Sequence, residues 1–543
     1  MNQTPNRPIG QSRVPGLAAI VMAAGLGKRM KSKQVKVLHL VAGRPMVLYA
    51  LDLADRLAGA GTVVVIGHQG EQVKAAIEVH GAAAGDPAGA RSAAKREKGL
   101  TAHVGRGAAP ARLFAVQLQQ LGTGHAVMQA RGAFLRARGA PASAYVILNG
   151  DTPLLKEATV RELLRLHESE RATVTVLTAV LDDPAGYGRV LRRDTGGPVL
   201  RIVEDRDATP MEARVREINV GTYVVDGSFL FEALDKLEPR NAQQEYYLTD
   251  IVGLAVERGL TVAAMAAPSA EESLGINTRR QLAMAEQVVR QELRDRWMEA
   301  GVTLRDPATP WIDHDVQIGQ DTVLYPNVTV EGKTAIGEDC VIHAQTRITN
   351  SRLGPRVLVQ DGCVVKDALL EEGVTIGPFA HLRPGTVLRR GAKVGNFVET
   401  KKAELGEGSK ANHLSYLGDA KIGRGVNIGA GTITCNYDGV RKHETVIEDE
   451  VFVGSDSQLV APVRIGRGAV IAAGSTVTQD VPPDDLAVAR AAQVNRPGWA
   501  ARRRALLALE GNQAPGANRE AQSKRSHPSR PTKRNTVKRK AKG

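Results

Sequence analysis

The chain has 543 residues, which is too long for a single hydrophobic core and predicts two or three domains. With 43% hydrophobic residues, each domain can form a packed core. Its formal net charge is +14, but residues 501–543 hold 13 Lys/Arg and only 2 Asp/Glu, so the remaining chain is nearly neutral. The basic character belongs to a tail, which argues against a nucleic-acid-binding surface on the body of the chain. Three cysteines, Cys340, Cys363 and Cys435, are too few for a disulfide framework and favour a reducing, cytoplasmic compartment.

Residues 17–278 alternate between short apolar runs and segments with helical spacing. The strand-like runs are 17–22, 62–67, 145–149 and 173–180. Residues 46–57 have the apolar spacing of a helix. The alternation predicts an α/β domain that is Rossmann-like, with a mostly parallel sheet. The first apolar run, 17–24, is too short to span a membrane, and we expect no membrane association.

Three other segments flank or interrupt this domain. Residues 1–16 are polar and contain proline, so we expect a disordered N-terminal tail. Residues 81–111 are rich in Ala and Gly without an apolar period, which predicts a flexible insertion. Residues 279–300 have apolar side chains three or four apart, which indicates an amphipathic helix that links two domains.

From residue 312 to about 480, Ile or Val followed by Gly recurs, and several of the intervals are multiples of six residues. Ile318 and Ile336 stand 18 residues apart, as three six-residue repeats per coil require. The pattern predicts an all-β domain over 301–500, a left-handed parallel β-helix of hexapeptide repeats. Its flat faces would pair into a homotrimer. Residues 501–543 are rich in Arg, Lys, Pro and Ser, and we expect a disordered basic tail.

A glycine-rich turn follows the first predicted strand. Gly25 and Gly27 let its amides approach phosphate oxygens, and Arg29 and Lys36 add positive charge for a triphosphate. The turn lacks the GK[ST] of a Walker loop, and alone it also fits an ordinary strand-to-helix connection. Asp151 ends the third predicted strand, at the sheet edge where open α/β folds bind ligands. The pattern favours a nucleotide site at this edge.

These residues lie in motifs that resemble a known family. GLGKRM followed by KVLH is similar to sugar-1-phosphate nucleotidylyltransferases, and QLQQLGTGHA narrows the resemblance to N-acetylglucosamine-1-phosphate uridylyltransferases. GYGRV, IVEDRDA and EINVGTY match the sugar-contacting segments of that family. The resemblance implies UTP and UDP-sugar contacts from Ala23, Ala24, Gly25, Gly27, Lys36, Gln117, Gly122, Thr123, Gly188, Glu204, Asn219 and Asn277. Among these it assigns the uracil contacts to Gln117, Gly122 and Thr123. Lys36 and Arg29 are the expected catalytic charges.

The resemblance also implies the chemistry of uridylyl transfer. Asp151 and Asn277 are expected to ligate Mg²⁺, which takes oxygen ligands together with substrate phosphates. An oxygen of the sugar phosphate would attack the α-phosphorus of UTP, and pyrophosphate would leave. Two positions depart from the family pattern: Val35 replaces the usual Pro before KVLH, and Asn149 replaces the usual aromatic residue before GD.

A second set of motifs lies within the repeats. AHLRPGT, GNFVETKK, KANHLSYLGDA, NYDGVRKHET and FVGSDSQLVAP resemble the acetyltransferase domain of bacterial bifunctional uridylyltransferase/glucosamine-1-phosphate N-acetyltransferases. Amine acetylation needs a base, and His413 is the candidate because histidine titrates near neutrality. The resemblance assigns glucosamine-1-phosphate binding to Arg383, Lys401, Tyr416, Asn427 and Lys442, and acetyl-coenzyme A binding to Asn436, Tyr437, Ser455, Ala473 and Arg490.

The two resemblances together imply synthesis of UDP-N-acetylglucosamine, a precursor of peptidoglycan and lipopolysaccharide, from glucosamine-1-phosphate, acetyl-coenzyme A and UTP with Mg²⁺. Three alternatives stay open. Cys435 could act as an acetyl-accepting nucleophile, the β-helix could serve only for assembly, and the basic tail could bind nucleic acid without sequence preference.

Overall fold

The computed structural model describes residues 13–25, 27–67, 69–84, 112–138 and 141–512. The described residues do not include residues 1–12, residues 85–111 of the insertion predicted for 81–111, or the predicted tail beyond residue 512. The chain forms two compact units, the first ending at Val488 and the second beginning at Ala489. Within the described part of the chain, no helix is both long and apolar enough to cross a membrane.

The first part of the chain is built on a nine-stranded mixed sheet, in which seven strands follow the order β11-β7-β10-β6-β1-β4-β5. Their bounds are β1 Leu17–Ala23, β4 Thr62–Ile66, β5 Leu113–Val116, β6 Ala144–Asn149, β7 Val174–Val180, β10 Glu217–Asp226 and β11 Val262–Ala266, with β8 Arg189–Arg192 paired to β10 and β9 Val199–Val203 paired to β8. The neighbours of β1 run parallel to it, whereas β10 is antiparallel to β6 and β7. The four predicted strands and the mostly parallel sheet are confirmed.

Helices cover both faces of this sheet. They are α1 Met46–Ala58, α2 Gly70–Ala84, α3 Thr123–Arg138, α4 Glu157–Ser169, α5 Gly227–Leu234 and α6 Asp250–Glu257. Leu17, Ala19 and Val21 of β1 pack with residues of α1 and α4, whereas Ala18 and Ile20 pack with residues of α3 and α5. Burial on both faces explains the continuous apolar run of this strand. The predicted helix over 46–57 is confirmed as α1.

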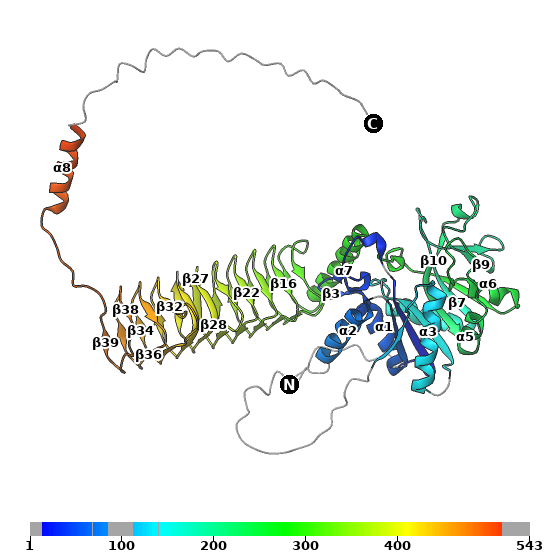
Figure 1. The fold of residues 1–543 in the computed structure, drawn as a ribbon, viewed down its shortest axis with the longest axis horizontal. Helices are drawn as coiled ribbons and strands as arrows, with labels where there is room; N and C mark the ends of the chain where they lie inside the picture. The colour runs from blue at the N-terminus through cyan, green and yellow to red at the C-terminus, as the bar shows by residue number, and fades with distance from the viewer. Residues whose placement is uncertain (1–12, 26, 68, 85–111, 139–140, 513–543) are drawn as a thin grey trace, which may run out of the picture. The chain divides into compact units, whose positions relative to one another are not determined.

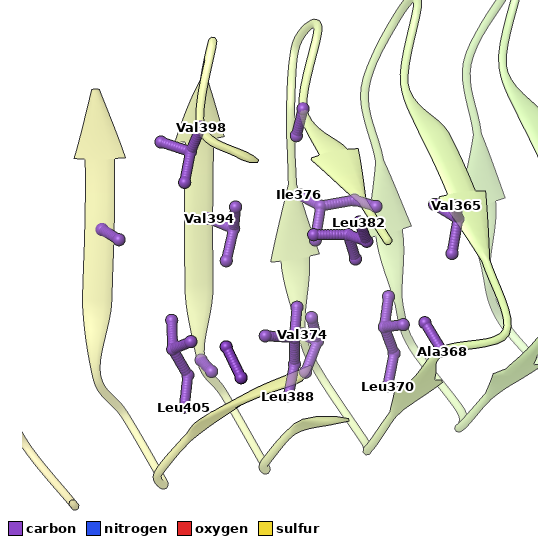
Figure 2. Close-up of a cluster of buried hydrophobic side chains, with 14 of the residues drawn as sticks. Val365, Ala368, Leu370, Val374, Ile376, Leu382, Leu388, Val394, Val398 and Leu405 are labelled. Atoms are coloured by element: carbon purple, nitrogen blue, oxygen red, sulfur yellow. The ribbon is translucent and has the colours of Figure 1, made fainter. Parts of the chain in front are cut away.

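Short parallel strands from β12 (Thr303–Leu304) to β39 (Leu486–Ala487) stack into a β-helix (Figure 1). From β12 to β25 (His381–Leu382) each strand pairs with the strand three places later, which gives three faces, and paired residues such as Thr329 and Arg347 are 17 or 18 positions apart. Around the longer strands that follow, the partner is two places later, as for β27 (Lys393–Asn396) and β29 (Lys410–His413). Figure 2 shows the aliphatic side chains inside the coils, where Ile376 lies beside Val394 of the next coil. The predicted β-helix of hexapeptide repeats is confirmed.

One coil of the β-helix is longer than its neighbours. Ile433 of β32 (Ile433–Cys435) pairs with Gln458 of β35 (Gln458–Val460), 25 positions later. The additional residues form a loop after Cys435 that contains an isolated bridge between Tyr437 and Lys442. A loop on a rigid coil is a typical place for binding residues.

The structure differs from the sequence prediction after residue 498. Residues 501–543 were expected to be disordered, but helix α8 spans Trp499–Asn512. The prediction averaged the composition of the whole tail, whereas its first residues, WAARRRALLALE, are strong helix formers that follow a Pro–Gly pair. Helix α2 likewise extends to Ala84, inside the predicted insertion.

Candidate active sites

A cleft lies at the carboxyl ends of β1, β5 and β6. It comprises three cavities of about 740, 280 and 360 Å³ that share lining residues such as Lys36, Asp151 and Asn277. The predicted residues that line it are Ala24, Gly25, Gly27, Arg29, Lys36, Gln117, Gly122, Thr123, Asp151, Gly188, Glu204, Asn219 and Asn277. Ala23 is buried within β1 and does not line these three cavities.

Three predicted residues meet at the centre of the cleft. The Lys36 ammonium forms an ion pair with the Asp151 carboxylate and donates a hydrogen bond to Asn277 Oδ1 at 3.1 Å. A carboxylate oxygen and an amide oxygen therefore converge on one cation. The described residues include no group of three His, Cys, Asp or Glu side chains that could hold a metal, so a metal bound here would need substrate oxygens to complete its ligands.

Local backbone contacts hold Asp151 and Asn277 together. The Ile276 N–H donates to the Asp151 carbonyl at 2.9 Å, which links the end of β6 to the segment before α7 (Arg279–Glu299). A capping box between Thr278 and Gln281 begins α7, and Gln281 Oε1 also accepts from the Asn277 N–H at 2.8 Å. The first turn of α7 thus orients the segment that carries Asn277.

The glycine-rich turn packs directly against Lys36. Gly27 has φ +61°, and a Cβ there would lie 2.5 Å from the Cβ of Lys36, so this position requires glycine. Val35, at φ −56°, adopts a backbone angle that proline also has, which explains why the departure from the family pattern leaves the Lys36 turn intact. Arg29, in the short helix Lys28–Met30, is exposed at the rim.

The predicted uracil-binding turn is fixed by a distant loop. Gln117 is buried, and its amide donates to the Gly122 carbonyl at 3.0 Å. A Cβ on Gly122 would lie 2.6 Å from the Tyr246 carbonyl oxygen, so the close approach requires glycine. Thr123 Oγ1 accepts from the Leu248 N–H at 3.0 Å. The loop 241–248, which sequence reasoning missed, therefore shapes this turn.

The predicted sugar-binding residues lie opposite this turn. Burial raises the pKa of Glu204, and a hydrogen bond from Thr249 at 3.1 Å opposes this shift. Asn219 donates to Tyr223 Oη at 2.7 Å just before an irregularity in β10, and its N–H donates to the Gly188 carbonyl at 2.9 Å. A half-buried carboxyl group and a fixed amide can both bind sugar hydroxyls.

Asn149 and Tyr187 are among the cleft residues that had no predicted role. Asn149 Nδ2 donates to the Gly221 carbonyl at 3.2 Å, so this departure from the family pattern ties the end of β6 to β10. Tyr187 lies beside Asp151, and burial, with the Asp151 charge as a smaller cause, raises the pKa of its hydroxyl. Tyr187 stands inside the GYGRV motif, which was the available signal.

The second site lies on the β-helix around His413. His413 is the last residue of β29 (Lys410–His413), and its side chain is exposed. Its Nδ1 forms a 2.8 Å hydrogen bond with Asn396 Oδ1. Sequence reasoning missed Asn396, although it stands 17 positions before His413, which is one coil of the repeat. That spacing could have identified it.

Positive charges gather on the neighbouring face. The Lys442 ammonium lowers the pKa of Lys401, and the Arg383 guanidinium adds to this effect. Arg383 forms an ion pair with Glu399 at 2.7 Å, and the hydrogen bond to Glu399 raises the pKa of the Arg383 guanidinium. Three cations close enough to interact form a binding surface suited to a phosphate dianion.

Polar groups border this cationic cluster. A Cβ on Gly418 would lie 2.5 Å from Tyr416 Oη and 2.7 Å from Asn436 Nδ2, so both side chains meet above this glycine. Asn436 also donates to Asp419 at 2.6 Å. Tyr437 is exposed on the long loop, and Asn427 is half-buried in β31 (Asn427–Ile428).

The predicted coenzyme-binding residues Ser455 and Ala473 continue the column of coil positions that contains His413. In this column Asn396 pairs with His413, and Ala430, Ser455 and Ala473 each stand two residues after the paired positions of the later coils. Ser455 and Ala473 are exposed. An extended ligand could therefore follow one edge of the β-helix away from His413.

Arg490 and Cys435 have a different status. Arg490 belongs to the second unit, where it is exposed, and its role stays a prediction. Cys435 is half-buried, and burial raises the pKa of its thiol, which disfavours the thiolate that a covalent acetyl transfer would need.

Known proteins match both halves of the chain. Residues 19–214 match the MobA-like NTP transferase domain, and residues 315–350 and 444–479 match the bacterial transferase hexapeptide (six repeats). A protein of Pelobacter propionicus named bifunctional protein GlmU is 50% identical over 89% of this chain and 98% of its own length. Proteins of the same name from Heliobacterium modesticaldum and an Exiguobacterium species are 49% and 45% identical over 87% and 89% of this chain, and over 95% and 99% of their own lengths.

Proposed function

The chain belongs to the GlmU family of bifunctional proteins, and from this premise we propose that it makes UDP-N-acetylglucosamine in two steps. It is a glucosamine-1-phosphate N-acetyltransferase and an N-acetylglucosamine-1-phosphate uridylyltransferase. The product is a precursor for cell-wall polymers. We place the enzyme in the cytoplasm, where UTP and acetyl-coenzyme A are made.

Uridylyl transfer takes place in the cleft of the α/β domain. The amides of the glycine-rich turn and the charges of Arg29 and Lys36 hold the triphosphate, so that a sugar phosphate oxygen attacks the α-phosphorus and pyrophosphate leaves. Asp151 and Asn277 would hold Mg²⁺, because their oxygens already converge on a cation. The metal would neutralise phosphate charge when bound.

The two substrates of uridylyl transfer bind in different parts of the cleft. Gln117 and the Gly122–Thr123 turn bind the uracil, whereas Glu204, Asn219 and Gly188 bind the sugar. Gln117 Nε2 donates to the Gly122 carbonyl and lies 3.1 Å from His125 Nδ1, so within the described residues its Oε1 is left to accept from an N–H of the base, which uracil offers.

Acetyl transfer takes place at the β-helix. Arg383, Lys401 and Lys442 bind the phosphate of glucosamine-1-phosphate, with Tyr416 and Asn427 on the sugar. The amine attacks the thioester carbonyl, the His413 imidazole takes the proton from nitrogen, and the C–S bond breaks as coenzyme A leaves and takes up a proton. Ser455 and Ala473, with Asn436, Tyr437 and Arg490, bind the coenzyme.

The observation that carries the acetyl-transfer proposal is the cluster of three interacting cations on the face neighbouring that of His413, because a β-helix used only for assembly has no need of it. The hexapeptide repeats favour an oligomer, and we propose a homotrimer in which neighbouring subunits share each site.

The test supplies the purified chain with glucosamine-1-phosphate, acetyl-coenzyme A, UTP and Mg²⁺, and mass spectrometry follows the products. We expect UDP-N-acetylglucosamine, with N-acetylglucosamine-1-phosphate as the intermediate. Release of coenzyme A without an acetylated sugar, or formation of UDP-sugar only from supplied N-acetylglucosamine-1-phosphate, would instead support a β-helix that serves assembly.

A further inference from the structure

Asn396 faces His413 from the preceding coil of the β-helix. The two residues pair in register between β27 (Lys393–Asn396) and β29, and Asn396 Oδ1 lies 2.8 Å from His413 Nδ1. Hydrogen bonds to the backbone carbonyls of both residues support this pair: the Leu414 N–H donates to the Asn396 carbonyl at 3.0 Å, and the Ser415 hydroxyl donates to the His413 carbonyl at 2.8 Å. The amide and the imidazole are therefore held together by the coil geometry.

The coil itself does not require an amide at this position. The same column carries Ala430, Ser455 and Ala473 in later coils, where a methyl or hydroxymethyl side chain satisfies the fold. Asn396 is only half-buried, so its removal leaves no large cavity. Its long polar side chain thus needs an explanation outside the packing of the β-helix.

The chemistry of the hydrogen bond supplies that explanation. An amide oxygen only accepts, so a neutral imidazole bound through Nδ1 to Oδ1 carries its proton on Nδ1 and leaves the lone pair of Nε2 free. The opposite amide orientation, with Nδ2 donating to Nδ1, would place the proton on Nε2 and remove the base. The orientation of one amide therefore decides whether His413 can accept a proton from the substrate.

We propose that Asn396 is a positioning residue for acetyl transfer: its Oδ1 holds the Nδ1 proton of His413, so that Nε2 takes the proton from the attacking amine. The inference rests on the proposed role of His413 as the base. When Nε2 has accepted the proton, Nδ1–H still donates to Asn396, so the same bond also stabilises the imidazolium that forms.

Three substitutions at one position test this assignment. Asn396→Ala and the nearly isosteric Asn396→Leu remove the acceptor, and we expect kcat for acetylation to fall about 10- to 100-fold, part of the 10² to 10⁴ that a positioned base contributes. KM for glucosamine-1-phosphate and for acetyl-coenzyme A should stay within about twofold. Asn396→Asp, which can only accept, should retain most of kcat, with the acidic limb of its pH–rate profile moved to higher pH because a carboxylate favours the imidazolium.

Asn412→Ala provides the matched control. It removes the same side chain one residue from His413 on β29, and among the described contacts Asn412 makes no hydrogen bond to the imidazole. We expect its kcat to be unchanged. Uridylylation of supplied N-acetylglucosamine-1-phosphate and thermal unfolding report on folding in every variant. If Asn396→Ala unfolds, Asn396→Ser, the residue that the coil accepts at Ser455, takes its place.

A double-mutant cycle separates this inference from the proposed function. His413→Ala alone should lose acetylation, and adding Asn396→Ala should cost nothing more, because the positioned group is already gone. Near-normal acetylation by His413→Ala would overturn the base itself and the inference with it. An additional 10-fold loss in the double variant, a wild-type kcat for Asn396→Leu, or an Asn396→Asp variant as slow as Asn396→Ala would overturn the positioning role while leaving His413 as the base.

Discussion

At the residue scale, each site holds a cation in an ion pair that the substrate phosphate must displace. Lys36 is paired with Asp151, and Arg383 is paired with Glu399, although each cation is assigned to a phosphate group. Such pairs keep a cation oriented in the free protein at a small net cost, because partly exposed ion pairs are weak. A phosphate that carries two negative charges can compete for the cation, so these pairs prepare the sites without blocking them.

Replacement of Asp151 should separate the two activities. Asp151→Ala removes the carboxylate from the centre of the cleft, and we expect uridylyl transfer to fall by at least about 10²-fold, the scale of a lost electrostatic contact at a reacting phosphate. Acetylation should remain within about twofold, because its residues lie on the β-helix. Assays of each half-reaction check this. Asp151→Asn, similar in size but uncharged, should fail as well, and full activity of that variant at saturating Mg²⁺ would contradict the metal role.

Asp250, at the start of α6, should make stability depend on pH. Burial, and to a smaller extent the Asp207 charge, raise the pKa of Asp250 to about 6, so the folded protein binds this proton more tightly than the unfolded chain. Ionisation therefore weakens the fold as the pH rises from about 4 to about 6, and the cost is complete above that range.

Asp250→Asn removes this cost, since an amide does not ionise. We expect the variant to be more stable by about 1 kcal/mol at pH 7.5, after allowance for solvent screening of a half-buried group, and no more stable at pH 4. Hydrogen exchange of α6 in urea, in the full chain, measures the difference. The exposed Asp194→Asn is the control, and a gain of the same size at both pH values would contradict the assignment.

At the element scale, the loop 241–248 connects the two halves of the uridylyltransferase cleft. On one side the Tyr246 N–H donates to the Leu121 carbonyl at 2.7 Å and shapes the turn assigned to uracil. On the other, Asp207 accepts from the Ala242 N–H at 2.9 Å and from Tyr247 Oη at 3.1 Å. Asp207 stands three residues after Glu204, so the loop joins the nucleotide and sugar sides of the cleft.

Loss of the contacts that anchor this loop should weaken the binding of both substrates of uridylyl transfer. Asp207→Ala removes two of its anchors, and we expect KM for UTP and for N-acetylglucosamine-1-phosphate to rise about 3- to 10-fold, because the loop must be ordered at the expense of binding. Tyr247→Phe removes one anchor and should have a smaller effect in the same direction. Steady-state kinetics measure both. A fall in acetylation, or a larger effect of Tyr247→Phe than of Asp207→Ala, would contradict the role of the loop.

The elements differ in how far the sequence predicts them. Four strands of the sheet and the coils of the β-helix were predictable because burial on both faces, or a period of six, is a local pattern, as in β1 and the coil around Ile318. The strands β5 and β8 to β11 were not predicted. Asn396 and the loop 241–248 were missed because their roles depend on partners 17 to more than 100 positions away. Helix α8 was missed because a local helical sequence was averaged into a tail.

At the scale of the first unit, the two catalytic halves have separate cores joined through α7, whose Trp297 packs against the β-helix core. The β-helix core runs from Val302 to Val481 as one cluster, distinct from the clusters on the α/β sheet. Arg290 of α7 joins them: it is buried, donates to the Ile312 carbonyl at 2.8 Å, and lies 3.7 Å over the Trp311 ring. Separate cores predict that the acetyltransferase half can fold without the other.

Truncated chains test this independence. Residues 301–500 should fold, form a trimer and acetylate glucosamine-1-phosphate within a few-fold of the full chain, because stacked coils contact mainly their neighbours. Residues 279–500, which retain α7, should unfold at a higher temperature, since Arg290 then still pairs with the buried Asp313 at 3.2 Å, whereas the shorter fragment loses this ion pair. Sedimentation, acetylation kinetics and thermal unfolding measure the three properties. A fully active monomer of 301–500 would rule out sites shared between subunits, and equal unfolding temperatures for the two fragments would show that the Arg290 junction does not stabilise the first coil.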